Sequence, residues 1–161
     1  DPFATPGLDK ALGIERCNSL EEMLPQCLFV SVHTPLTPQT RHIMNEKTIG
    51  MMPKGSYLVN TARGPCVSGD AVVKALESGQ LAYAALDVVE KEPLEDERIR
   101  KHPKILLTPH SAFYSVEGFI EMRRKGAEEL RRMILGQPVV NLVNGHCMTN
   151  PRFKLPLSQL G

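Results

Sequence analysis

Three polar residues, Arg63, Glu92 and His110, each lie just beyond an apolar, strand-like run of the sequence. In an open α/β sheet, side chains beyond the carboxyl ends of parallel strands line the ligand crevice. A cation, a carboxylate and an imidazole are therefore expected to meet there. A guanidinium can hold an anionic group, and an imidazole beside a carboxylate can move a proton near neutral pH. The pattern predicts an enzyme site that binds an anionic substrate.

The composition is that of an ordinary globular protein. The chain has 161 residues, 42% hydrophobic and 23% charged, which is enough for one domain and too little for two full ones. Lysine and arginine number 19 against 18 acidic residues, and no basic stripe is interleaved with aromatics, so direct nucleic-acid binding is not expected. No apolar run approaches the roughly 18 to 20 residues that span a bilayer, so we expect a soluble protein with no membrane association.

The spacing of the cysteines and histidines bears on disulfide bonds and metal sites. Cys17, Cys27, Cys66 and Cys147 form neither a CxxC pair nor a disulfide framework, which favours reduced thiols and a cytoplasmic location. The histidines other than His110 show no metal-ligand spacing with cysteines or carboxylates, so no metal site is predicted. The chain begins without an initiator methionine, and we expect it to be a fragment.

Strand and helix signals alternate along the chain. Apolar runs predict strands at 28–32, 57–60, 82–88 and 105–107, and the first run is typical of a strand covered on both faces. Three helices are predicted, one before the first strand and one in each of the next two connections, with these cap and stop residues: Ser19, Asn45, Ser68 and Gly79. Alternating strands and helices indicate an α/β fold with a parallel sheet and right-handed crossovers.

The last predicted helix runs from about 116 to 135. One stripe of it is apolar and consists of Val116, Phe119, Ile120, Ala127, Leu130 and Ile134. Two i,i+4 ion pairs, Glu121 with Lys125 and Glu128 with Arg132, are expected on the solvated face. Periodicity fades after this helix, so the sequence predicts one domain over 1–144 and an irregular tail over 145–161.

Several motifs together carry a family resemblance. The runs 59–64 (VNTARG), 85–88 (ALDV), 92–93 (EP) and 108–110 (TPH) resemble, in order and spacing, the D-isomer-specific 2-hydroxyacid dehydrogenases. The resemblance covers roughly 1–144 and implies a Rossmann-like, doubly wound parallel sheet. The sheet is expected to be incomplete, because the chain contains no G-x-G-x-x-G and so lacks the first strand and its phosphate-binding loop.

The resemblance gives each of the three polar residues a role. His110 corresponds to the acid/base that protonates the carbonyl oxygen of a 2-keto acid. Glu92 corresponds to the carboxylate that pairs with this imidazole and favours its charged form, with Glu90 as the fallback. Arg63 corresponds to the anchor that grips the substrate carboxylate bidentately.

The resemblance also implies a set of residues that contact NAD. An acidic residue at the end of the second strand accepts hydrogen bonds from the adenosine ribose and repels a 2′-phosphate, so NAD is favoured over NADP. Other positions correspond to the adenosine loop, the nicotinamide ribose and the carboxamide. The implied cofactor-binding residues are Asp1, His33, Thr34, Pro35, Thr61, Ala62, Arg63, Asp87 and His110.

Two function classes stay open. The first is the NAD-binding portion of an oxidoreductase acting on a small D-2-hydroxy acid, inactive as this fragment alone and dimeric through this domain. Phosphoglycerate, glyoxylate and hydroxypyruvate enzymes all remain candidates. The second is a non-enzymatic, NAD-responsive corepressor scaffold with nuclear localisation, because residues 110–115 are similar to the C-terminal-binding-protein branch of the family.

Overall fold

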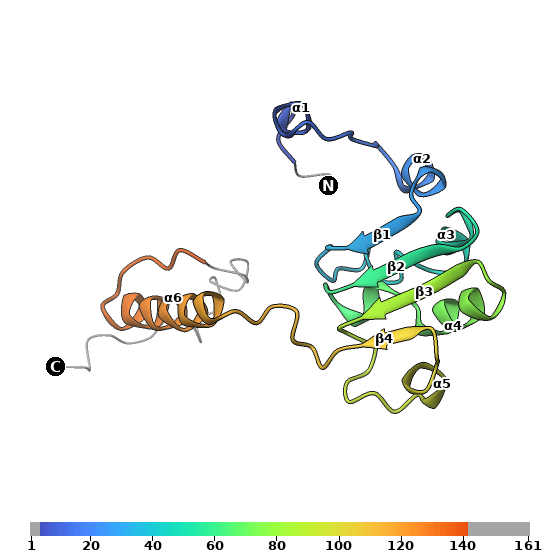
Figure 1. Ribbon diagram of the computed structural model, residues 1–161. Helices are drawn as coiled ribbons and strands as arrows, with labels where there is room; N and C mark the ends of the chain where they lie inside the picture. Colours follow the sequence, from blue (N-terminus) through green and yellow to red (C-terminus); the bar gives the residue numbers. More distant parts are fainter. Residues whose placement is uncertain (1–3, 142–161) are drawn as a thin grey trace. The chain divides into compact units, whose positions relative to one another are not determined.

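The computed structural model describes residues 4–141, and the chain divides into two compact units, Asp1–Ala112 and Phe113–Gly161. The first unit contains a sheet with its helices, and the second contains one long helix (Figure 1). The predicted domain over 1–144 stays a prediction, and the predicted tail over 145–161 lies outside the described residues.

A four-stranded parallel sheet forms the centre of the first unit. Its strands are β1 (Phe29–Val32), β2 (Ser56–Asn60), β3 (Leu81–Leu86) and β4 (Ile105–Leu107), in the spatial order β1-β2-β3-β4 (Figure 1). In register, Val32 lies opposite Asn60 and Asn60 opposite Leu86. Parallel neighbours require crossover connections, which here contain helices. The α/β, Rossmann-like class expected from the sequence is confirmed.

Short helices occupy the connections. They are α1 (Leu8–Leu12), α2 (Leu20–Met23), η1 (Leu24–Gln26), α3 (Glu46–Gly50), η2 (Gly64–Cys66), α4 (Gly69–Glu77) and α5 (Glu97–Arg100). The predicted caps are confirmed: Ser19, Asn45 and Ser68 accept hydrogen bonds from first-turn amides, and Gly79 follows α4 with a φ of 74°. The sequence did not predict α1 and α5, because one helical turn is too short to show a hydrophobic period.

The core lies on one face of the sheet. Val30, Leu58 and Ala84 point to that face and are buried in one apolar cluster with Ile49 of α3 and Val72 of α4. The amphipathic α4 buries its apolar side there and leaves its polar side exposed. This packing fixes the strands, and therefore the positions of the loops that follow them.

The opposite face of the sheet carries exposed aromatic side chains within the first unit. Phe29 is 67% exposed and Tyr83 is 54% exposed, and both stack on Tyr57, with ring centroids 4.5 and 6.2 Å apart. The prediction that the run 28–32 is covered on both faces is therefore wrong within the first unit. A run of apolar residues gives a strand, but it does not reveal whether a second layer lies over it.

Helix α6 (Val116–Ile134) belongs to the second unit. Ser115 caps it by accepting from the amide of Gly118, and none of its residues is buried. Its predicted bounds are confirmed to within one residue. Glu121 pairs with Lys125 at 3.2 Å as predicted, but Glu128 pairs with Arg124, one turn before it, instead of Arg132. Within residues 4–141, no helix combines the length and hydropathy needed to cross a membrane.

Candidate active site

The carboxyl ends of the four parallel strands lie at one edge of the sheet, and the loops that follow them carry the predicted site residues. His33 follows β1, Arg63 follows β2, Glu92 lies in the loop after β3, and His110 lies in the loop after β4. This is the edge at which ligands bind in open α/β sheets. The topology therefore brings four loops with complementary polar groups to the same edge.

His110 and Glu92 form a pair across two of these loops. Nδ1 of His110 lies 2.9 Å from Oε2 of Glu92, and Oε1 of Glu92 accepts from the amide of Val89 at 3.3 Å. The hydrogen bond with His110 lowers the pKa of the Glu92 carboxyl, against the opposing effect of partial burial. Because Nδ1 faces the carboxylate, the ring nitrogen suited to exchange a proton with a substrate is Nε2.

Asp87 holds the loop that carries His110. Its carboxylate is buried and accepts from the hydroxyl of Thr108 at 2.5 Å and from the amides of Ser111 at 2.8 Å and Ala112 at 3.0 Å. Its backbone carbonyl accepts from the amide of His110 at 3.0 Å. Burial by itself raises the pKa of Asp87, but the hydrogen bonds from Thr108 and the two amides outweigh it, so the pKa is lowered. Asp87 therefore remains ionised and fixes the His110 loop.

Asn60 gives the Arg63 loop its shape. The side chain is fully buried; its Nδ2 donates to the carbonyl of Arg63 at 3.0 Å and its Oδ1 accepts from the amide of Ala62 at 3.1 Å. The exposed guanidinium of Arg63 donates through Nη1 to the carbonyl of Ala62 at 2.6 Å. A guanidinium has five N–H donors, so this bond leaves capacity for an anion. No role was predicted for Asn60, although a polar residue at the buried end of a strand indicates that its side chain has hydrogen-bond partners.

Gly64 brings the Arg63 loop against the loop that carries Glu92. A β-carbon at Gly64 would lie 1.8 Å from the carbonyl oxygen of Val89, a distance that no side chain can occupy. Glycine is therefore required at this position because two backbones touch. The contact places the loops of Arg63 and Glu92 side by side.

A pocket of about 440 Å³ lies beside the acid–base pair. Glu92, His110, Asp87 and Thr108 line it together with Arg100 of α5 and several apolar side chains. Among the described residues, Arg63 is not part of this lining. The structure thus joins two of the three predicted catalytic residues directly and the third through its neighbouring loop, and all three roles stay predictions.

Those predicted cofactor residues that the structure describes lie at the same edge of the sheet. His33 contacts the hydroxyl of Ser31 at 2.8 Å, Thr34 donates to the sulfur of Cys66 at 3.6 Å, and Thr61 is exposed. Hydroxyls and a carboxylate of this kind fit ribose hydroxyls and a carboxamide, since Asp87 uses three of about four acceptor positions. Asp1 lies outside the described residues. Pro35 and the other predicted contacts stay predictions.

The comparisons with known proteins bear on this geometry. A family model described as D-isomer specific 2-hydroxyacid dehydrogenase, NAD binding domain, matches residues 1–112. D-3-phosphoglycerate dehydrogenase from Bacillus subtilis (strain 168) is 37% identical over 153 residues, which cover 95% of this chain and 29% of the relative. The chain thus spans less than a third of that protein.

Solved structures agree with the family model. The holo form of Rhodotorula graminis D-mandelate dehydrogenase is 38% identical with a TM-score of 0.78, covering 86% of this chain and 40% of that one. A D-isomer specific 2-hydroxyacid dehydrogenase from Xanthobacter autotrophicus Py2, in complex with NADPH and MES, is 37% identical with a TM-score of 0.67, covering 78% of this chain and 51% of that one. The chain therefore belongs to the D-isomer specific 2-hydroxyacid dehydrogenase family, and its first 112 residues match the NAD binding domain.

Proposed function

We propose that this chain supplies the acid–base and anion-binding side of an NAD-dependent enzyme that interconverts a D-2-hydroxy acid and its 2-keto acid. The observation that carries the proposal is the 2.9 Å contact between His110 and Glu92 at the ligand-binding edge of the sheet. Family membership supports the reaction class, because the similar proteins include dehydrogenases of 3-phosphoglycerate and mandelate, both 2-hydroxy acids.

In this proposal each residue has one task. Arg63 holds the substrate carboxylate through two parallel N–H bonds and turns the adjacent carbonyl toward His110. The nicotinamide, when bound, supplies the hydride. His110 gives a proton from Nε2 to the carbonyl oxygen, and Glu92 stabilises the charged ring through Nδ1. In the reverse direction the neutral imidazole takes the hydroxyl proton. Asp87 keeps His110 in place throughout.

Steady-state reduction of glyoxylate, hydroxypyruvate and 3-phosphohydroxypyruvate by NADH, in the complete protein that contains this chain, tests the proposal. Replacement His110→Gln is expected to lower kcat by roughly 10²- to 10⁴-fold, the usual contribution of general acid–base catalysis. His102→Gln is the matched control, because among the described residues the His102 ring accepts from the amide of Lys104 alone. Absence of turnover with all three substrates, or full activity of His110→Gln, would contradict the proposal.

We further propose that the protein acts in the cytoplasm as a homodimer formed through this domain. The cysteine pattern supports the compartment, since the three described cysteines, Cys17, Cys27 and Cys66, are free thiols. The sheet face of the first unit exposes the aromatic rings of Phe29 and Tyr83. Exposed apolar surface of this kind favours packing against further protein. Light scattering coupled to size exclusion should give twice the monomer mass; a monomer at all concentrations would contradict the dimer.

A further inference from the structure

Glu92 lies in an exposed loop between β3 and α5, so its position depends on what holds that loop. The side chain of Glu92 is 43% exposed, and it contacts the ring of His110 and the amide of Val89. An exposed loop of this kind opens easily unless other contacts anchor it. The contacts of Glu90, two residues before Glu92, anchor this loop.

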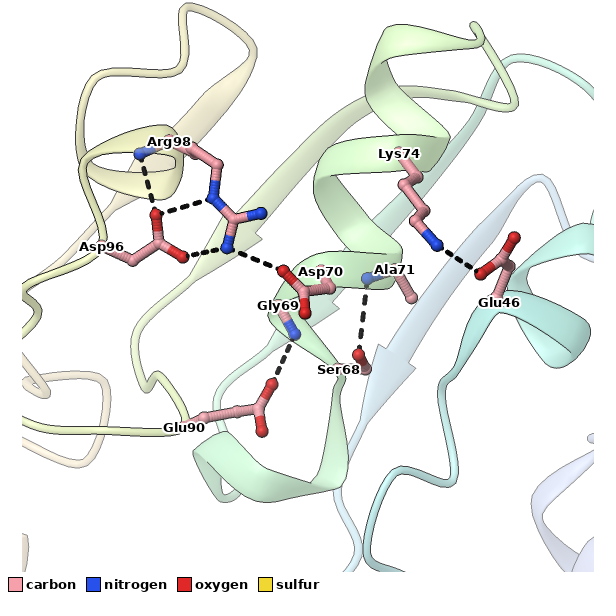
Figure 2. A network of polar contacts seen from close by, with 9 residues as sticks. All are labelled: Glu46, Ser68, Gly69, Asp70, Ala71, Lys74, Glu90, Asp96 and Arg98. Atoms are coloured by element: carbon pink, nitrogen blue, oxygen red, sulfur yellow. Dashed lines mark hydrogen bonds and ion pairs between the residues drawn. The ribbon is translucent and has the colours of Figure 1, made fainter.

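Glu90 bridges two separate elements with its carboxylate. Oε2 lies 2.8 Å from Nε2 of His42, in the loop before α3, and Oε1 accepts from the amide of Gly69 at 2.6 Å. Figure 2 shows Glu90 directed toward Gly69 at the start of α4, where Ser68 caps the amide of Ala71. A carboxylate is favoured at a helix N-terminus, because the free amides there carry partial positive charge.

His42 is itself held firmly, so it can act as a fixed point. Its amide donates to the carbonyl of Pro65 at 2.8 Å, and its carbonyl accepts from Nδ2 of Asn45 at 2.9 Å. Pro65 directly follows Gly64 in the Arg63 loop. Through His42, the Glu90 carboxylate is therefore tied to the loop beside Arg63 as well as to α4.

The far end of the same loop has its own attachment to α4. Arg98 of α5 lies 2.7 Å from Asp70 and 2.6 Å from Asp96, bridging the two carboxylates (Figure 2). The loop from β3 to α5 is thus fixed to α4 at Gly69 and at Asp70. Glu92 lies between these two attachments. The attachment made by Glu90 is the nearer one in sequence, two residues before Glu92.

We propose that Glu90 is the positioning residue of the acid–base pair: by bridging His42 and the start of α4, it holds the loop so that Glu92 meets Nδ1 of His110. The inference rests on the proposed function, because the pair matters only in a site that transfers a proton. Glu90 is not placed in contact with substrate, and its effect passes entirely through the position of Glu92.

Carbon-13 NMR titration of the Glu92 carboxyl in the 161-residue chain tests this role. In Glu90→Ala the pKa of Glu92 is expected to rise toward its ordinary range, because Glu92 loses its hydrogen bond with His110. The direction is diagnostic: removing the nearby negative charge of Glu90 would by itself lower the pKa of Glu92. Glu90→Gln, which loses the charge but retains an oxygen for Gly69 and an amide for His42, should show no rise.

Two further variants complete the design. His42→Asn keeps a residue that tolerates the φ of 50° but removes the ring, so the pKa of Glu92 should rise even if Glu90→Ala does not fold. Glu95→Ala is the control, because the partner of Glu95 within residues 4–141 is exposed Lys91 of the same loop. An unchanged pKa in Glu90→Ala and His42→Asn, or an equal rise in Glu95→Ala, would overturn the inference. The titration uses neither substrate nor dinucleotide, so its outcome is separate from that of the reduction assay.

Discussion

At the scale of single residues, the contact between His110 and Glu92 makes a direct prediction. The largest influence on the Glu92 carboxyl is the hydrogen bond with the His110 ring, which lowers the pKa of Glu92. His110→Asn preserves the left-handed backbone at a φ of 53° but is too short to reach Glu92. The pKa of Glu92 should therefore rise in this variant, as measured by NMR titration of its carboxyl carbon. His33→Asn, remote from Glu92, serves as the control and should leave the titration unchanged.

Asp87 makes the corresponding prediction for stability. Its pKa is lowered on folding, so its hydrogen bonds contribute stability above the unfolded pKa of about 3.9, and this is lost as the pH falls through the lower folded value. In Asp87→Asn an amide nitrogen faces a backbone N–H donor, which should cost about 1–3 kcal/mol at pH 7. Below about pH 4, the free energy of unfolding of the variant should also fall less steeply than that of the unmodified chain, because the variant has no carboxyl at position 87 to protonate.

Urea unfolding of Asp87→Asn between pH 7 and pH 3 measures both effects. Asp70→Asn is the matched control, because the exposed pair of Asp70 with Arg98 contributes little in water. Equal stabilities of Asp87→Asn and Asp70→Asn at pH 7 would show that the network around Asp87 does not hold the loop.

At the scale of elements, the active-site edge depends on how closely the loops after β2 and β3 approach. A β-carbon at Gly64 would overlap the carbonyl of Val89, so Gly64→Ala must push the two loops apart. We expect a loss of about 1–3 kcal/mol in the free energy of unfolding, as for other overpacked sites. Gly50→Ala, where a β-carbon meets nothing within 4 Å, should be neutral or stabilising. Comparable unfolding midpoints for the two variants would contradict the close contact.

At the scale of the whole molecule, residues 1–112 match an NAD binding domain, but the chain contains no glycine-rich phosphate-loop motif. The sequence contains no G-x-G-x-x-G, and such a loop supplies the backbone amides and helix N-terminus that bind pyrophosphate. We therefore expect the 161-residue chain to bind NADH at least about tenfold more weakly than the phosphoglycerate dehydrogenase of Bacillus subtilis. Isothermal titration calorimetry of both proteins measures the difference. Equal affinities would mean that the residues of this chain alone bind the cofactor fully.

Most of the fold could be predicted because its signals are local. The runs before Arg63 and His110 are apolar and short, and the caps Asn45 and Ser68 identify helix starts by side chains that bond their own first turn. The third strand ends at Leu86, earlier than the predicted 88, because Asp87 and the residues after it turn into the active-site loop. That turn depends on Thr108 and Ser111, which are distant in sequence.

The sequence by itself determined the family motifs, the alternation of strands and helices, and the residue types available for proton transfer and anion binding. Each of these is a property of neighbouring residues or of their order. The sequence favoured Glu92 over Glu90 as the partner of His110, and the structure contains that contact. Only the tertiary structure decided that Glu90 joins His42 to α4 and that Asp87 holds the His110 loop. The physical reason is that these contacts link positions 18 to 48 residues apart, whose separation is fixed by strand register and by the backbone contact at Gly64.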